Sequence, residues 1–270
     1  MPRQQGFTLV ELVMVIVLLG IVATMSTQFV SLSVRGAIDL GDRQQRALQS
    51  VVISEQITRE LREAHPLSVR AESQCIEWIS ALGATTYKNL PVEEASREVL
   101  ISPLGESVAD AIRDNPARFR LAVYGYSVSN FYDNSGDVAP ISSPISALED
   151  DGSVTDGKVS LASTHRFNTH SPQKRIYVLK GPVSICQNGD KLYRFENYGL
   201  MPSQPSFVDL NNSAGQSVMA ANLIANSFRV NSRPISLQRS AVVNFEFILK
   251  AQNSEETTRV SQEVQIHNVP

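Results

Sequence analysis

Gly6-Phe7-Thr8-Leu9-Val10-Glu11-Leu12 opens an apolar run that continues to Met25. Glu11 is the only ionisable residue between Phe7 and Met25, and the next charged residue is Arg35. As a helix that rises about 1.5 Å per residue, the run extends about 28 Å, close to the roughly 30 Å hydrocarbon thickness of a bilayer. The sequence therefore predicts a transmembrane helix over about residues 7–28.

Glu11 is the one residue in this run that a plain membrane anchor does not need. An ionised carboxylate inside a membrane helix costs about 2.5–3.5 kcal/mol on insertion scales. One alternative is an ordinary signal anchor with an incidental glutamate, and another is a proton-relay carboxylate of the kind found in pumps. A single span with no second ionisable residue offers no relay, so we predict another purpose for Glu11.

A short polar leader that ends in Gly6, with Phe7 next and Glu11 four residues later, resembles the class III signal of type IV pilins and type II secretion pseudopilins. The resemblance implies that a prepilin peptidase cuts between Gly6 and Phe7 and that Phe7 is then N-methylated. A secretory signal peptide would be cut after its apolar region instead. The resemblance also implies an assembly salt bridge between Glu11 and the freed amine of Phe7, within one chain or between neighbours.

The helical pattern continues beyond the apolar run. Apolar residues recur at spacings of three and four, with charged and amide side chains on the other faces. They are Ala47, Val51, Ile53, Ile57, Leu61 and Ala64. Because the first proline after Phe7 is Pro66, one helix of about 59 residues, roughly 88 Å long, is predicted over residues 7–65. A body of this size cannot bury such a helix, so its first half is predicted to protrude and its second half to pack on the body.

From Pro66 onward the apolar period changes to two, which indicates an antiparallel sheet with one face on a core. The predicted strands are 74–80, 119–126, 174–179, 183–187, 192–197, 228–230, 235–238, 241–249 and 260–266, with a hairpin turn at 187–190. Residues 127–163 and 198–216 are rich in turn-forming residues and are predicted to be long loops. The predicted fold is α+β, a pilin-like lollipop with a leader at 1–6, a helix at 7–65 and a mostly β body at 66–270.

Cys75 and Cys186 are the only cysteines. On the oxidising side of a membrane they can form one intramolecular disulfide, which would close a loop of about 111 residues and stabilise the fold by about 4.7 kcal/mol in the chain-entropy model. Two unpaired buried thiols are the alternative. Trp78 is predicted to be a core residue.

The sequence contains no nucleotide-binding loop, nucleophile elbow or zinc-protease motif, so we predict that the chain is not an enzyme and needs no cofactor. His165 and His170 lie in a polar segment and are expected to be exposed to solvent and to bind no metal. The oxygen-rich stretches Asp133–Asp137 and Glu149–Asp151 lack the spacing of a calcium loop, so solvated turns are favoured. A net charge of -3 argues against a nucleic-acid partner.

Further features resemble the minor pilins of the mannose-sensitive haemagglutinin type of type IV pilus, which are related to the larger minor pseudopilin of type II secretion systems. They are the length of the chain, a cysteine near the end of the helix, and the closing Glu263-Val264-Gln265-Ile266-His267-Asn268-Val269-Pro270. Gln28 also stands where major pilins usually carry a helix-kinking proline.

The resemblance implies a subunit that crosses the bacterial inner membrane once, with a cytoplasmic N terminus and a periplasmic body, and then helps to initiate a fibre and to cap its tip. Its expected partners are the prepilin peptidase, the lipid bilayer, the inner-membrane assembly platform, and other minor pilins and the major pilin through their N-terminal helices. A secretion pseudopilin is the alternative. A tip adhesin that binds a surface glycan is a second one, for which Phe131-Tyr132-Asp133-Asn134 offers an aromatic and amide cluster.

Overall fold

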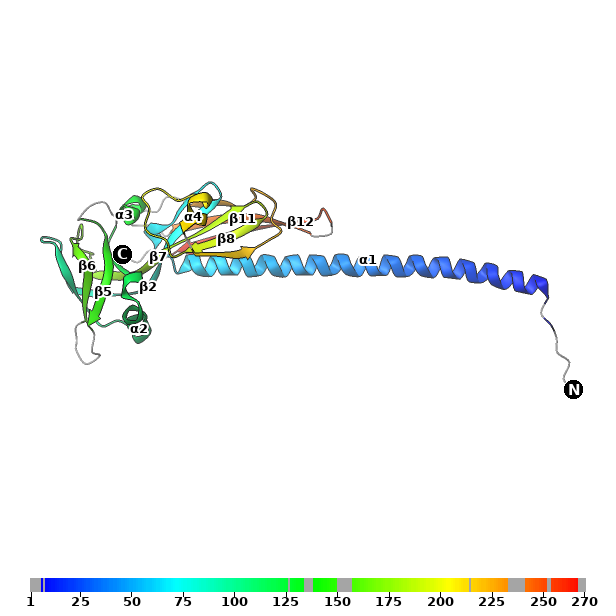
Figure 1. Ribbon diagram of the computed structural model, residues 1–270, viewed down its shortest axis with the longest axis horizontal. Coiled ribbons are helices and arrows are strands. Elements are labelled where there is room, and N and C mark those ends of the chain that lie inside the picture. The colour runs from blue at the N-terminus through cyan, green and yellow to red at the C-terminus, as the bar shows by residue number, and fades with distance from the viewer. Residues whose placement is uncertain are drawn as a thin grey trace.

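The computed structural model describes residues 6, 8–125, 127–133, 138–149, 157–213, 215–232, 241–251 and 254–266. A single helix, α1 (Leu9–Arg62), runs for 54 residues and protrudes as a rod from a compact body (Figure 1). The predicted long helix is therefore present, two residues shorter at its start and three at its end than the predicted range 7–65. Pro66 lies four residues after the last residue of α1, and the helix ends before it because a proline cannot continue the ladder of helical hydrogen bonds.

The described part of the body is mostly antiparallel sheet with three short α-helices and two 3₁₀ helices. Its elements are η1 (Pro66–Ser68), β1 (Arg70–Glu72), β2 (Cys75–Asn89), β3 (Ser96–Ile101), α2 (Glu106–Asp114), η2 (Pro116–Arg118), β4 (Arg120–Ala122), α3 (Val128–Tyr132), β5 (Ile141–Glu149), β6 (Gly157–His165), β7 (Arg175–Asn188), β8 (Lys191–Glu196), α4 (Phe207–Ser213), β9 (Gly215–Ala220), β10 (Arg229–Ser232), β11 (Ala241–Lys250) and β12 (Thr257–Ile266). The α+β, pilin-like layout predicted from the sequence is confirmed.

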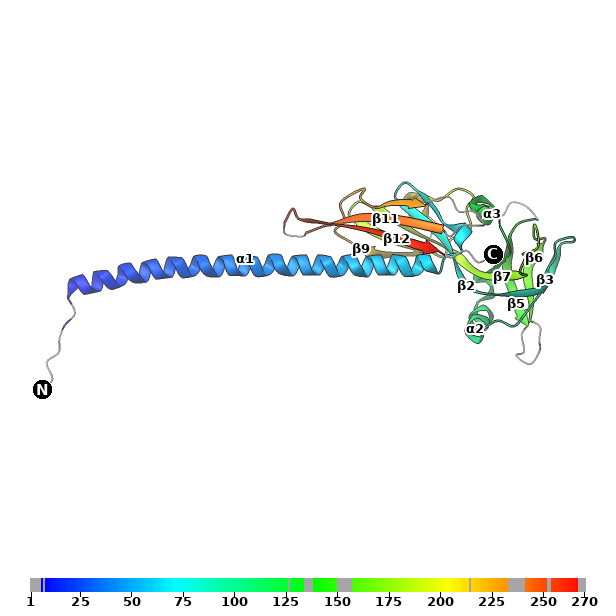
Figure 2. The ribbon, with the colours of Figure 1, turned by 180° about the vertical axis from the view of Figure 1, so that it is seen from behind.

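Two long strands, β2 and β7, run through both lobes of the body and pair with each other along most of their length. Beyond a register shift at Ile79–Gly83, the ladder β2-β3-β6-β5-β4-β7 returns to β2 and closes on itself, so this distal lobe has the connectivity of a small barrel. Before the shift, β1, β2, β7, β8 and β9 form an open sheet in the lobe nearest to α1, and β10-β11-β12 form a second sheet. Figure 1 and Figure 2 show the two lobes one beyond the other along the line of α1.

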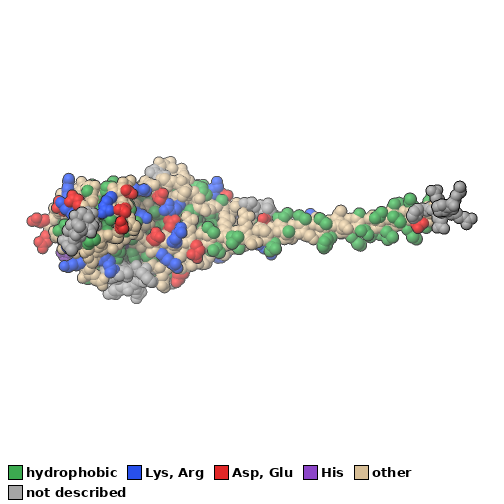
Figure 3. Space-filling model, turned by 90° about the horizontal axis from the view of Figure 1, so that it is seen from below, with side chains coloured by type: hydrophobic (Ala, Val, Ile, Leu, Met, Phe, Trp, Pro, Cys, Tyr) green, Lys and Arg blue, Asp and Glu red, His purple; other side chains and the backbone are tan. Residues whose placement is uncertain are grey.

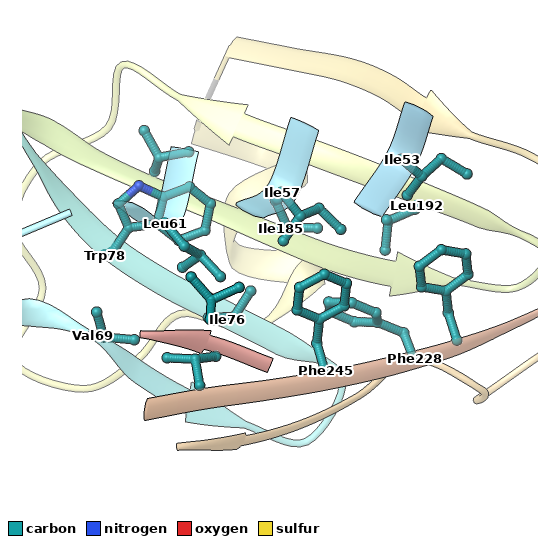
Figure 4. Close-up of a cluster of buried hydrophobic side chains, with 14 of the residues drawn as sticks. Ile53, Ile57, Leu61, Val69, Ile76, Trp78, Ile185, Leu192, Phe228 and Phe245 are labelled. Atoms are coloured by element: carbon teal, nitrogen blue, oxygen red, sulfur yellow. The ribbon is translucent and has the colours of Figure 1, made fainter. Parts of the chain in front are cut away.

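The last turns of α1 lie along one side of the near lobe and bury one face against it (Figure 1). Ile53, Ile57 and Leu61 are buried there and pack against residues of both sheets, among them Trp78 and Phe245 (Figure 4). A fully buried side chain of this size stabilises the fold by about 1.5–3 kcal/mol. The prediction that the sheet covers the second half of the helix is thus correct for its last three turns, and Trp78 is a core residue as predicted.

The first half of α1 touches no other part of the described chain closely enough to be covered. Its apolar side chains from Leu9 to Leu40 are exposed, and they line the rod in Figure 3. This is the protruding segment that length and periodicity predict.

Three predictions for residues 119–187 are wrong. The supposed loop at 127–163 contains α3, β5 and most of β6, where buried Ile145, Val159 and Leu161 alternate with serines and a lysine. The alternation was hidden by a serine-rich composition, since serine is common in turns but also fits the wet face of a sheet. Likewise, 174–179 and 183–187 are one strand, β7, which continues through Pro182 at the register shift. The predicted strand 119–126 shrinks to β4.

The second supposed loop, 198–216, contains α4 and the start of β9, and α2 was not predicted at all. The hairpin at 187–190 is confirmed, because β7 and β8 pair as neighbours and Gly189 adopts a φ of 60°, which glycine accepts without strain. The predicted strand 235–238 lies outside the described residues.

His65 forms the joint between α1 and the body. Its backbone N–H donates to the carbonyl of Ile79 (2.8 Å), and its ring lies 4.5 Å from that of Phe131 and 5.0 Å from that of Tyr177. The side chain is almost entirely buried, and burial lowers the pKa of His65 from 6.5 to about 4. The folded protein therefore holds this imidazole neutral at pH values where the unfolded chain protonates it.

We predict that the body loses stability as pH falls from about 6.5 to about 4. In this window the unfolded state binds more protons than the folded state, so the free energy of unfolding must decrease as pH decreases, by about 3 kcal/mol for His65 alone. Urea unfolding of the detergent-solubilised chain, followed by fluorescence of the single Trp78, gives this free energy at each pH. The difference between wild type and His65→Gln isolates the histidine, and a pH-independent difference would contradict the assignment.

Candidate processing and assembly site

The start of α1 is built as a capped helix. Thr8 has an extended backbone conformation (φ −77°, ψ 148°), and its hydroxyl accepts a hydrogen bond from the backbone N–H of Glu11 at 3.3 Å. Thr8-Leu9-Val10-Glu11 has the residue spacing of a capping box, in which a Thr or Ser at the cap precedes a Glu or Gln by three residues. Sequence reasoning about the membrane missed this motif, although the four residues alone could have revealed it.

Capping gives Glu11 a second physical explanation. A carboxylate in the first turn also interacts favourably with the positive end of the helix dipole, typically by about 0.3–1 kcal/mol. That is less than the roughly 2.5–3.5 kcal/mol cost of an ionised carboxylate in a membrane helix, so capping alone does not compensate the charge. Glu11 is exposed and has no ion-pair partner among the described residues. Phe7 lies outside the described residues, so the salt bridge between Glu11 and its amine stays a prediction.

Gly6 is free of packing constraints. A Cβ atom added to it would meet nothing within 4 Å, and its backbone conformation is not one that disfavours other residues. The fold itself therefore does not require glycine at this position. Any requirement for a small residue at Gly6 must come from another molecule that grips the chain there.

The apolar part of α1 is long enough to cross a membrane. It is the one helix in the described residues that meets this criterion, and none of its most apolar stretch is buried within the chain. The helices of a soluble core bury their apolar side, whereas these side chains are exposed on every side of the rod. The geometry suits a helix surrounded by lipid or by other apolar helices.

Ion pairs tie the emerging part of α1 to the body. Glu256, beside the turn between β11 and β12, accepts hydrogen bonds from both Arg43 and Arg46 of α1. These arginines, Arg43 first, lower the pKa of Glu256. Arg46 is itself buried, so its pairing with Glu256 offsets part of the cost of desolvating the guanidinium. Further along, Glu60 of α1 pairs with Arg194 of β8 at 2.9 Å.

A buried polar cluster joins Arg70 of β1, Glu77 of β2 and Tyr198. Glu77 is completely buried and pairs with Arg70 at 2.5 Å, and it also accepts a hydrogen bond from the hydroxyl of Tyr198 at 3.1 Å. Burial raises the pKa of Glu77, and the hydrogen bond and charge of Arg70 partly oppose that rise. Arg70 also stacks on Tyr132 and donates to backbone carbonyls of residues 201–203. No sequence pattern singled out this cluster, because its members are scattered along the chain.

Cys75 and Cys186 are joined by a disulfide bond. They face each other at the first register position of the β2–β7 ladder, with Cα atoms 4.2 Å apart. Both side chains are buried, beside Phe195, Tyr198 and Leu210. Cys186 lies two residues before Asn188, the last residue of β7.

The remaining candidate residues do not form a site. His165, expected to be exposed, is buried, and its Nε2 lies 3.0 Å from the carbonyl oxygen of Ala139. His170 is exposed and lies beside the hydroxyl of Tyr87 (3.3 Å). Within the described ranges no three His, Cys, Asp or Glu residues are grouped as metal ligands. Most of the stretches Asp133–Asp137 and Glu149–Asp151 lies outside these ranges.

The aromatic pair proposed for glycan binding is buried. Phe131 and Tyr132 of α3 have no exposed surface, and the Tyr132 hydroxyl donates to the carbonyl of Ser68 at 2.7 Å. Their rings pack in the core between the two lobes. A stacking platform for a sugar needs an exposed ring face, so this part of the adhesin hypothesis is wrong.

A family model described as the prokaryotic N-terminal methylation motif matches residues 1–27. No curated protein and no solved structure matches the chain. The motif match supports a structural subunit of the type IV pilin or pseudopilin kind. It also implies processing by a prepilin peptidase and assembly with other pilins, and it is consistent with a single-pass inner-membrane anchor.

We predict that both cysteines are oxidised in the mature protein. A thiol-reactive label applied to the denatured, non-reduced protein should find no free cysteine, and the same label after reduction should find two. Cys75→Ser, Cys186→Ser and the double variant should each lose about 2–5 kcal/mol of stability, with no further loss in the double variant, because all three lack the same bond. Two reactive cysteines before reduction would show that the pair is not bonded.

Proposed function

We propose that this chain is a minor pilin of the MshO kind, which helps to initiate a type IV pilus of the mannose-sensitive haemagglutinin class and remains near its tip. The observation that carries the proposal is a methylation motif over residues 1–27 that includes the start of a 54-residue helix whose first half is uncovered. An uncovered apolar helix needs lipid before assembly and other helices after it.

The leader at residues 1–6 is proposed to be removed between Gly6 and Phe7, and Phe7 to be N-methylated. The mature chain then begins at the apolar helix, which spans the inner membrane over about residues 7–28, with the body at 66–270 in the periplasm. A disulfide in the body supports this orientation, since disulfides persist in the oxidising periplasm. The inner-membrane assembly platform, the other minor pilins and the major pilin are the proposed partners.

Glu11 is proposed to pair with the amine of Phe7 of a neighbouring subunit. In an apolar surrounding, a lone carboxylate is costly and an opposite charge offsets the cost. A subunit at the very apex of the fibre would lack one such neighbour. The presence of Glu11 therefore favours a position beneath another minor subunit.

A minor pseudopilin of a type II secretion system, of the GspJ kind, shares each of these features and is the alternative. The two assignments differ in what the cell loses when the subunit fails. Surface fibres disappear in one case, and secreted enzymes are retained in the other. Each variant below is therefore scored for both surface fibres and protein secretion, and a defect in secretion alone would replace the pilus assignment by the pseudopilin one.

We predict that Gly6→Val leaves the leader attached. The fold tolerates a larger residue at this position, so a processing defect would reflect recognition by the peptidase. Gly36→Val is the matched control, because Gly36 of α1 is equally open and lies outside the leader. Mass spectrometry of the N-terminal peptide should find N-methylated Phe7 in the wild type and in the control, and the leader sequence in Gly6→Val. A wild-type chain that retains residues 1–6 would refute the processing proposal.

We also predict that Glu11→Ala and Glu11→Gln both assemble poorly. Glutamine keeps the capping-box pattern but removes the charge, whereas alanine removes both. If the charge pair matters, both variants should insert and be cleaved normally yet recover several-fold fewer partner pilins in pull-downs from membranes, since a broken desolvated pair costs about 3–5 kcal/mol. Glu94→Gln, on the exposed surface of the far lobe, is the control. An assembly defect in Glu11→Ala but not in Glu11→Gln would show that Glu11 acts as part of the helix cap and that its charge is not needed.

A further inference from the structure

The strand β7 has a gap in its pairing on one side. Its edge away from β2 pairs with β4 at 177–179 and with β8 at 184–188. Between these two partners, residues 180–183 have no strand neighbour on that side within the described chain, because β4 belongs to the distal lobe and β8 to the near lobe. This stretch of β7 is therefore the floor of a fork between two strands.

A cleft of about 710 Å³ lies in this fork, within the size range of ligand pockets. Residues 180–183 line it, together with 117–120 on the side of β4 and 196–200 on the side of β8. The end of α1 and the end of α2 also line it, and Figure 1 shows both on the same side of the body. Arg118 donates to Oδ1 of Asn197 at 2.6 Å, so one hydrogen bond joins the two walls.

Two arginines of the cleft differ in how their charge is balanced. Arg194 of β8 lies 2.9 Å from Glu60 and 2.8 Å from Glu196. Arg120 of β4 is half-buried, and its side chain makes one hydrogen bond within the described residues, to the carbonyl of Ser142 at 2.9 Å. Because a guanidinium has five N–H donors, most of those of Arg120 are left for a ligand. Burial lowers the pKa of Arg120 unopposed, whereas for Arg194 the same effect of burial on the pKa is outweighed by Glu196 and Glu60.

The other charged side chains without an ion pair in the cleft are exposed. They are Arg118, Lys180, Glu63 and Asp114. Water screens exposed charges of either sign, so the half-buried Arg120 has the larger effect on which charge the cleft accepts. A carboxylate suits it best, because a guanidinium and a carboxylate form two parallel hydrogen bonds.

We propose that this cleft binds an extended acidic peptide segment of a partner protein, with a carboxylate of the peptide on Arg120 and its backbone along 180–183 of β7. A peptide that adds to a free sheet edge gains main-chain hydrogen bonds, and the side-chain contacts give specificity. The unpaired stretch is about 13 Å long at about 3.3 Å per residue, which suits a chain better than a single small acid. The inference applies equally to a pilin and to a secretion pseudopilin, so it does not depend on the proposed function.

Two residues of the unpaired stretch suit such a ligand. Pro182 has no N–H to donate, and within sheets proline is found where a strand lacks a neighbour or at a bulge. Gly181 has no side chain to keep another backbone away, and a Cβ added there would meet only the carbonyl oxygen of Tyr198, at 3.9 Å. Glycine within a strand often marks a place where a ligand or a second backbone approaches closely.

The test measures the binding of fluorescent peptides to the detergent-solubilised full-length chain by fluorescence anisotropy. The probe is an eight-residue peptide in which glutamate and threonine alternate. One matched peptide has glutamine in place of glutamate and lacks the charge, and another has proline in place of threonine and lacks half of the backbone N–H groups. The glutamate–threonine peptide should bind at least tenfold more tightly than either. Equal affinity for a matched peptide, or no binding of any of the three, would overturn the proposal.

Substitutions in the chain locate the binding site. Arg120→Gln should weaken binding of the glutamate–threonine peptide at least tenfold. Arg97→Gln, on β3 outside the cleft, changes the net charge equally and should leave binding unchanged. Lys180→Gln alters an exposed side chain that lines the cleft, so it should weaken binding several-fold without disturbing the fold. Near-UV circular dichroism, to which the single Trp78 contributes, checks that each variant is folded.

Three results would contradict the assignment. Equal losses in Arg97→Gln and Arg120→Gln would show that the peptide responds only to overall charge. Unchanged binding in Arg120→Gln and Lys180→Gln would place the peptide elsewhere on the molecule. A sulfated polysaccharide that binds more tightly than the peptide, with the same dependence on Arg120, would assign the cleft to a carbohydrate polyanion.

Discussion

Three buried side chains hold the long helix to the rest of the molecule. Ile53, Ile57 and Leu61 pack against both sheets of the near lobe, and each stabilises the contact by about 1.5–3 kcal/mol. The exposed ion pair between Arg43 of the same helix and Glu256 contributes at most about 1 kcal/mol. Apolar packing therefore fixes the direction in which the helix leaves the body. Every other property of the rod, including its exposed length and which side faces outward, follows from that attachment.

The sequence predicts α1 well because several local signals agree. An uncharged run, a threonine cap, a period of three to four and a late proline all indicate one long helix. The body is predicted less well, because its strands compete with turn chemistry. Serine-rich β5 and β6 were taken for a loop, and only pairing with each other and with β3 shows that they are strands, in which most of the serines lie on the less buried side of a sheet. The closure of the ladder through β2 and β7 depends on contacts that no local pattern contains.

Some residues of the candidate site could also be predicted from the sequence, and others could not. Gly6, Phe7 and Glu11 form a continuous motif that can be read directly, and the pairing of Cys75 with Cys186 could be predicted because two cysteines allow only one bridge. His165 was wrongly expected to be exposed, since its burial depends on the carbonyl of Ala139 from a distant turn.

The position of the disulfide has a mechanical consequence. Any tension applied along α1 leaves the helix at Arg62 and enters the body through the short connection to β2, whose first residue is Cys75. At that residue the chain is covalently linked to β7, which spans both lobes. A pull that passes along the chain to Cys75 is thus shared between β2 and β7, the two strands that pair along most of their length.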